Sequence, residues 1–234
     1  MKILPSLLLF SISVQLSAQT ILIDFGKDTQ QTSGEWNNFA EDTNYRFPNS
    51  NPSPVLMLDD MIDSTGAETL VDLYYVTKSS ESASAGIGGA DFDVATTIGQ
   101  PRSATRDTMF INRGSQAASA TFELRGLDAN GLYDLTFYAG IAAERNATDW
   151  TVDGMTVSLN PENNTTQTVT ITGAQADASG VLSILWAGNT GTSSNTSAHW
   201  NSLQIVAVPE PSATGLFATL AAASAVVLLR RRRA

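Results

Sequence analysis

The chain has 234 residues, of which 42% are hydrophobic, 8% aromatic and 15% charged, a composition that excludes wholesale disorder and fits one or two globular domains. Residues 19–208 contain 8 basic and 22 acidic residues, a net charge of −14, and so acidic a body excludes nucleic acid as a partner. The chain has no cysteine and one histidine, which excludes disulfides, thiolate chemistry, cysteine-bound metals and most hydrolytic triads.

The N-terminus has the three parts of a secretory signal peptide. Lys2 supplies one positive charge, residues 3–14 form an apolar run, and the small residue Ala18 stands before Gln19. We therefore expect export, with cleavage between Ala18 and Gln19 that removes residues 1–18. A retained membrane anchor is the alternative, but the apolar run is short and interrupted by serines.

Residues 19–207 show the period-two alternation of β-strands, bounded by Gly, Asn, Asp and Ser. Eight to ten strands are expected, and the clearest cover residues 20–26, 70–77, 120–125, 133–139, 150–152, 155–159, 166–172, 180–186 and 199–206. The pair Asp153-Gly154 predicts a two-residue hairpin turn. A helical turn is expected only within residues 54–62, and long connections with short strands over 27–53 and 78–118.

These strands predict an all-β fold for residues 19–207, a single antiparallel β-sandwich with one apolar face on each sheet. The opening segment Ile23-Asp24-Phe25-Gly26 and the closing segment 200–205 resemble those of jelly-roll, galactose-binding-like modules. A shorter stretch from Gly126 to Tyr133 is similar to a loop and strand of fibronectin type III domains. The resemblance implies a jelly-roll arrangement of the sandwich, by analogy of fold alone.

Three kinds of candidate site occur in this body, each with a structural alternative. His199 has no nucleophile motif near it, so we interpret it as structural and assign no catalytic residue. Asp91 and Asp93 place two carboxylates on one side of an extended segment, which suits Ca²⁺, although a solvated acidic surface is the preferred interpretation. Asp59-Asp60 and the pair Asp149 and Asp153 are further acidic clusters. No other cofactor is expected.

Aromatic side chains are the candidates for binding a sugar ring. Trp186 and Trp200 lie in predicted strands and are expected in the core. Trp36 lies in a turn-rich segment and is the better candidate for a glycan-binding residue. A glycosidase needs only two carboxylates about 5–10 Å apart, but the sequence alone identifies no such pair.

The C-terminus has three parts in a fixed order. Pro209, Glu210 and Pro211 precede an uncharged run over residues 213–229, and Arg230, Arg231, Arg232 and Arg233 follow. As a helix the run would reach about 25 Å, which spans a slightly thinned bilayer. The arginines would stay on the cytoplasmic side, so the body would lie outside the inner membrane.

This order is similar to the PEP-CTERM sorting signal of Gram-negative bacteria, here residues 208–234. The resemblance implies that exosortase, an inner-membrane enzyme, cuts the chain near Pro209-Glu210-Pro211. The inner membrane would then hold only the precursor, and the mature form would reach the cell envelope or the extracellular space.

We therefore expect a non-enzymatic, exported protein with a structural or adhesive role in association with extracellular polysaccharide. A carbohydrate-binding module of defined glycan specificity is the first alternative, and it predicts an exposed aromatic pair flanked by amides. A glycan hydrolase or lyase is the second, and it predicts a cleft with two carboxylates of raised pKa.

Overall fold

The computed structural model describes residues 18–41, 45–48, 54–80, 83–88, 92–112, 118–143, 147–189 and 197–209. Fourteen strands and two short helices are found within these ranges, so the chain is mostly β, as expected. Within the same ranges no helix is long and apolar enough to cross a membrane. The apolar run over 213–229 and most of the signal peptide lie outside them.

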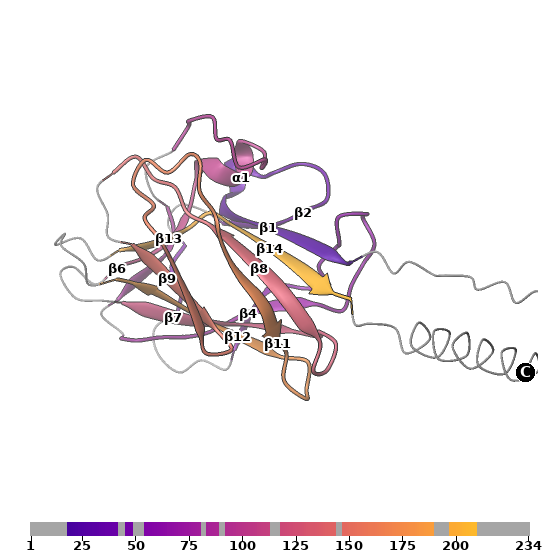
Figure 1. Ribbon diagram of the computed structural model, residues 1–234. Helices are drawn as coiled ribbons and strands as arrows, with labels where there is room; N and C mark the ends of the chain where they lie inside the picture. Colours follow the sequence, from indigo (N-terminus) through magenta and orange to yellow (C-terminus); the bar gives the residue numbers. More distant parts are fainter. Residues whose placement is uncertain are drawn as a thin grey trace, which may run out of the picture. The chain divides into compact units, whose positions relative to one another are not determined.

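A five-stranded sheet forms one layer and has the strand order β11-β8-β14-β1-β2 (Figure 1). Its strands are β1 (Thr20–Lys27), β2 (Trp36–Glu41), β8 (Leu132–Tyr138), β11 (Val169–Gln175) and β14 (Ser202–Val208). Neighbouring strands are antiparallel except β1 and β2, which run parallel from the pair Leu22 and Trp36 onward. The sandwich is therefore not purely antiparallel, because the chain passes through η1 (Asp28–Gln30) before it returns beside β1.

A six-stranded sheet has the order β10-β9-β12-β7-β4-β3, and a three-stranded sheet has the order β13-β6-β5. The larger sheet contains β3 (Val55–Leu58), β4 (Asp72–Lys78), β7 (Ser119–Arg125), β9 (Thr148–Val152), β10 (Met155–Leu159) and β12 (Leu182–Gly188). The smaller one contains β5 (Ser84–Ile87), β6 (Met109–Asn112) and β13 (Ala198–Trp200), and the helix α1 (Ser103–Arg106) precedes β6.

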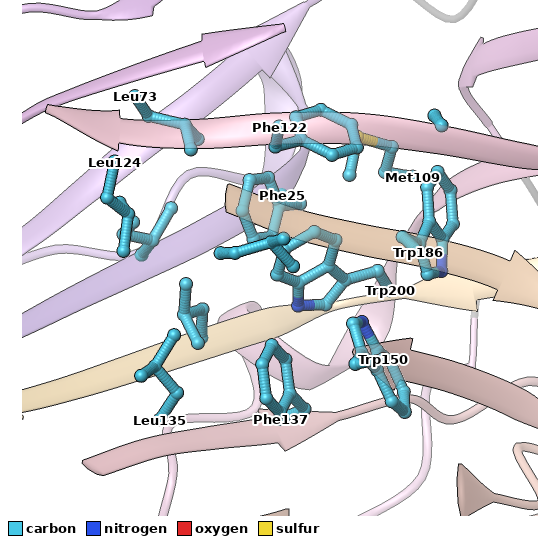
Figure 2. Packing of buried hydrophobic residues seen from close by; sticks show 14 of the residues in the cluster. Phe25, Leu73, Met109, Phe122, Leu124, Leu135, Phe137, Trp150, Trp186 and Trp200 are labelled. Carbon is cyan, nitrogen blue, oxygen red and sulfur yellow. The ribbon is translucent and has the colours of Figure 1, made fainter. Parts of the chain in front are cut away.

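Inward-facing side chains of the two large sheets meet in one core, which makes the architecture a sandwich. Phe137 of β8 stacks on Trp150 of β9, with ring centroids 5.0 Å apart. Trp200 packs among aromatic rings from both layers (Figure 2), namely Phe25, Phe122, Phe137, Trp150 and Trp186. This core needs no disulfide because burial of large aromatic and aliphatic side chains supplies the stabilisation.

The strand registers follow the alternation in the sequence. On β8, Tyr133, Leu135 and Phe137 are buried, whereas Asp134 and Thr136 are half-buried on the outer side. A slip of one residue would exchange these two sets, so the pattern itself fixes the register. The hairpin turn at Asp153 and Gly154 is also confirmed, with positive φ angles of 48° and 72° that match a type I′ turn.

Several expectations about local structure were wrong. Fourteen strands are described rather than eight to ten, and the short helices are η1 and α1 rather than a turn within residues 54–62. Val55–Leu58 is a strand rather than a helical turn, because its backbone pairs with β4 through Val55 and Tyr75. The strand expected over 199–206 is two strands separated by Asn201, since β13 pairs with β6 while β14 pairs with β8. In both places a sheet partner that is distant in the sequence decides the outcome.

Candidate functional site

The four tryptophans divide into three core residues and one surface residue. Trp150, Trp186 and Trp200 are each 0% exposed, which confirms the core positions expected for Trp186 and Trp200. Trp36 is half-buried at the first position of β2, an edge strand of the five-stranded sheet. Its ring makes no contact with another aromatic ring of the described chain, so it is the tryptophan available at the surface.

Trp36 begins a row of side chains that crosses the outer face of the five-stranded sheet. Each member lies directly opposite the next on the neighbouring strand, and we call these five residues the Trp36 row: Trp36, Leu22, Gln204, Thr136 and Thr170. With strands about 4.8 Å apart, the row is about 19 Å long. It offers an aromatic ring, an aliphatic side chain, an amide and two hydroxyls, and those of Thr136 and Thr170 are hydrogen-bonded at 2.9 Å.

Two asparagines that the sequence did not single out hold Trp36 in place. Asn37 donates from Nδ2 to the carbonyls of Leu22 (3.0 Å) and Ile62 (2.8 Å), and its Oδ1 accepts from the Ile62 N–H (2.9 Å). Asn38 bridges the turn before β2, accepting from the Thr32 N–H (2.7 Å) and donating to the Thr32 carbonyl (2.9 Å). Because both amides bond to backbone, β2 and its first residue are fixed on the sheet.

The outer face of the six-stranded sheet also carries an aromatic residue, but its ring is covered. The Arg125 guanidinium lies 4.2 Å from the centre of the Tyr74 ring. Glu123 Oε2 also forms an ion pair with this guanidinium, 2.6 Å from Arg125 Nη2. Tyr74 therefore makes a cation–π contact with Arg125, and less of its ring is accessible to a ligand than that of Trp36.

An open polar hollow of about 320 Å³ lies between η1 and the segment that carries α1. Its lining includes one carboxylate, Asp93, together with Arg102 and Arg106. Arg102 Nε lies 2.6 Å and Arg106 Nε 3.7 Å from Asp93 Oδ1, so the carboxylate is neutralised by the arginines. Asp91 lies outside the described residues, and a calcium site at Asp91 and Asp93 stays a prediction.

Two other aspartates are buried close to this hollow without lining it. Asp24 on β1 is 2% exposed and Asp107, just after α1, is 1% exposed. Burial raises the pKa of Asp24 to about 7, against the lowering effect of a hydrogen bond from the Thr32 side chain, and the Asp107 carboxylate raises it further. The Thr32 hydroxyl lies 2.7 Å from Ser103 Oγ, which does line the hollow.

An acidic group at the surface comes together from two elements of the chain. Carboxylate oxygens of Asp59, Asp60 and Asp72 lie within 4.8 Å of one another, and the Asp60 N–H donates to Asp72 Oδ1 (2.9 Å). Two of the three are exposed. The sequence indicated Asp59 and Asp60 but not Asp72, which reaches them from β4.

The remaining predicted residues are accounted for as follows. His199 is 3% exposed and its backbone N–H donates to Thr148 Oγ1 (3.1 Å), and its interpretation as structural stays a prediction. Gln19, beside the expected signal-peptide cleavage point after Ala18, accepts a backbone hydrogen bond from Ala207 (2.9 Å). Pro209 is exposed. Glu210, Pro211 and residues 230–233 lie outside the described residues.

No family model and no curated protein matches the sequence. Among solved structures, a family 35 carbohydrate-binding module from Clostridium thermocellum is 18% identical, with a TM-score of 0.32 over 66% of this chain and 98% of that chain. A β-(1,4)-mannanase of Podospora anserina with GH26 and CBM35 parts is 18% identical, with a TM-score of 0.30 over 55% of this chain and 27% of that one.

A calcium-binding mutant of Bacteroides uniformis β-glucuronidase 2 is 12% identical, with a TM-score of 0.43 over 81% of this chain. The present chain spans 27% of the length of the mannanase and 18% of the length of the glucuronidase. Likeness of this degree describes a partial match of strands and carries nothing about a ligand or an activity.

Proposed function

We propose that this protein is exported, sorted by exosortase and kept outside the cell, where it binds polysaccharide without cleaving it. The Trp36 row is the observation that supports the binding half of the proposal. A half-buried indole can cover the apolar face of a sugar ring, while the amide and the two hydroxyls further along the row can bond to the hydroxyls of other sugar rings of the same chain. A row that extends across five strands suits an extended chain better than a small molecule in a pocket.

The charge of the body narrows the class of polysaccharide. Residues 19–208 carry a net charge of −14, which disfavours a polyanionic glycan by repulsion. The Trp36 row itself contains no ionisable side chain. The proposed ligand is therefore a neutral polysaccharide, held by stacking and neutral hydrogen bonds.

Two observations favour a non-catalytic role over a glycan hydrolase or lyase. Such an enzyme needs two carboxylates that reach its substrate. In the described residues, the polar hollow presents only Asp93, which two arginines hold. The carboxylate with the strongly raised pKa, Asp24, is 2% exposed and does not line the hollow.

The alternative of a module with defined glycan specificity predicted an exposed pair of aromatic residues. The Trp36 row holds one aromatic ring, and the ring of Tyr74 on the other sheet is covered by Arg125. One stacking position gives weak binding, which many copies along one polysaccharide chain would strengthen by avidity. The sandwich is proposed to follow the jelly-roll pattern that its opening and closing segments resemble.

Affinity electrophoresis in gels that contain the host's neutral extracellular polysaccharide tests the binding surface. We expect the wild-type protein to be retarded and W36A to lose retardation, with affinity about tenfold lower. Y74A is the matched control, an aromatic residue removed from the other outer face. Q204A provides a second variant within the row should W36A be poorly folded. Equal retardation of wild type, W36A and Q204A would overturn the assignment of this face.

A separate experiment tests sorting. With Pro209, Glu210 and Pro211 all changed to alanine, the signal proposed for exosortase is gone and the precursor should accumulate in the inner membrane. The intact mass of wild-type protein recovered outside the cell should lack residues 1–18 and the C-terminal segment beyond the cut. Unchanged release of the triple variant would refute the sorting signal while leaving the binding proposal standing.

A further inference from the structure

The carboxylates of Asp24 and Asp107 share one small buried space on the outer side of β1. Asp24 and Gly26 are two residues apart on this strand, so they face the same side. The Asp107 carboxylate fills the place above Gly26, where an added Cβ would lie 2.3 Å from its Oδ1. Glycine at position 26 is thus what lets Asp107 approach the strand beside Asp24.

The hydrogen bonds of Asp24 leave one oxygen without a partner. Its Oδ2 accepts from the Thr32 N–H (3.2 Å) and from the Thr32 hydroxyl (2.7 Å). Its Oδ1 is fully buried and accepts no hydrogen bond from the described residues. The large majority of buried side-chain polar atoms in native proteins have a hydrogen-bond partner, so Asp24 Oδ1 is a position at which a species from solution can bind.

We propose that Asp24 and Asp107 bind a divalent cation of the Ca²⁺ type in this buried space, with Asp24 Oδ1 as a direct ligand. Burial of the Asp24 carboxylate carries a large desolvation cost and the Asp107 carboxylate repels it, and a cation bound to Asp24 Oδ1 would relieve both. The donors are hard oxygen atoms, which Ca²⁺ prefers. Softer metals prefer thiolate or imidazole ligands. The chain has no cysteine and its one histidine is on β13, so these two aspartates do not favour such a metal.

The position of the cation would join three parts of the chain. Asp24 belongs to β1, Asp107 follows α1, and Thr32, which bonds Asp24, also bonds Asn38 at the start of β2. The Lys27 N–H donates to Asp107 Oδ2, so β1 holds both aspartates. Binding would therefore stabilise the folded protein and the turn that precedes Trp36. This inference does not depend on the proposed polysaccharide binding.

Thermal unfolding of the full chain in detergent micelles, stripped with EDTA or supplied with excess CaCl₂, tests the proposal. For saturating Ca²⁺ we expect the wild-type melting temperature to rise by about 5 °C or more. D24N keeps the shape and the bonds from Thr32 but lacks the charge, and its melting temperature should be the same with EDTA and with Ca²⁺. D72N, which changes the surface acidic group, is the matched control and should retain the full rise.

Luminescence of Tb³⁺, which replaces Ca²⁺ at oxygen sites, gives a second readout that does not depend on stability. Trp200 packs on Phe25, the residue after Asp24, with ring centroids 4.6 Å apart, so that bound Tb³⁺ should be sensitised by tryptophan excitation. The signal should be present in wild type and D72N and absent in D24N. The proposal is overturned if Ca²⁺ does not stabilise the wild type, or if D24N responds as the wild type does. Loss of the response in D72N alone would assign it to the surface group instead.

Discussion

Thr32 donates two hydrogen bonds to the same oxygen of Asp24, one from its backbone N–H at 3.2 Å and one from its hydroxyl at 2.7 Å. This arrangement binds the turn before β2 to the outer side of β1, where Asp24 lies. It also concentrates the stabilising contacts of the carboxylate on Oδ2, while Oδ1 is buried beside Asp107. The carboxylate is therefore poorly solvated, and its protonation is coupled to folding.

In the absence of divalent cations, stability should fall as pH rises from about 4 to about 7. The pKa of Asp24 is about 7 in the folded protein and near its ordinary value of 3.8 when unfolded, so the folded state binds the extra proton within this window. Over this whole window the loss is up to about 4 kcal/mol, caused first by burial of the charged carboxylate and in part by repulsion from Asp107. Urea unfolding in EDTA at pH 5 and pH 8 measures the difference, and D24N should lose most of it. A wild type that is equally stable at both values would contradict the burial of a chargeable group here.

Replacement of two core tryptophans by phenylalanine should have unequal effects. The Trp200 indole N–H donates to the Ser202 carbonyl (3.0 Å), whereas the Trp186 indole N–H is buried with no hydrogen bond in the described chain. W200F reduces the ring volume and leaves the Ser202 carbonyl without its donor, at a cost of about 2–4 kcal/mol. W186F reduces the ring volume in the same way but removes a donor that has no hydrogen bond, so it should cost about 1–2 kcal/mol less. Chemical denaturation measures both. The same loss in the two variants would show that these N–H groups do not matter.

The hairpin turn between β9 and β10 offers a test of backbone strain alone. Gly154 has a φ angle of +72°, and an added Cβ would meet nothing within 4 Å. G154A should therefore cost about 1 kcal/mol, entirely from the left-handed backbone. D153N is the control, because asparagine tolerates the φ of 48° at position 153 and should change stability by less than about 0.5 kcal/mol. If G154A unfolds at the wild-type urea concentration, the turn is not the type I′ turn described.

Asn201 connects the segment after α1 to the sandwich through a side chain that is 0% exposed. Its Nδ2 donates to the carbonyls of Asp107 (2.6 Å), Thr105 (3.2 Å) and Gly140 (3.2 Å), and its Oδ1 accepts from the Gly140 N–H (2.8 Å). N201A should cost about 3 kcal/mol and speed amide hydrogen exchange over residues 103–108. N201D should cost more, since it directs a carboxylate at carbonyl oxygens. Exchange in N201A that matches the wild type would remove this residue as the connection.

Much of the fold was predictable because apolar and polar residues alternate along most of its strands. Strands such as Ser119–Arg125 and Leu132–Tyr138 have one apolar face, so local sequence alone placed Phe122 and Phe137 in the core. The same reasoning failed at Val55–Leu58. This short edge strand is defined by its pairing with β4 and not by alternation in its own sequence. It also failed at Asn201, the single residue that separates β13 from β14, where one continuous strand was expected.

The candidate sites divide in the same way. Trp36 stood out because a tryptophan in a turn-rich segment is unusual, and its place at the surface follows from that context. Its row was not predictable, because Leu22, Gln204 and Thr136 come together only through strand register. Asp24 and Asp107 are 83 residues apart in the sequence, and no local pattern indicated that Gly26 would admit one carboxylate beside the other.

The most direct test of polysaccharide binding at the Trp36 row is acrylamide quenching of tryptophan fluorescence with and without the host's neutral polysaccharide. Since Trp150, Trp186 and Trp200 are each 0% exposed, the quenchable fraction of the emission comes from Trp36. A polysaccharide that stacks on this ring should shield it and reduce the quenching constant, and W36F should show little quenching in either condition. If polysaccharide binds the protein while acrylamide quenching stays unchanged, the contact lies elsewhere and the central claim is contradicted.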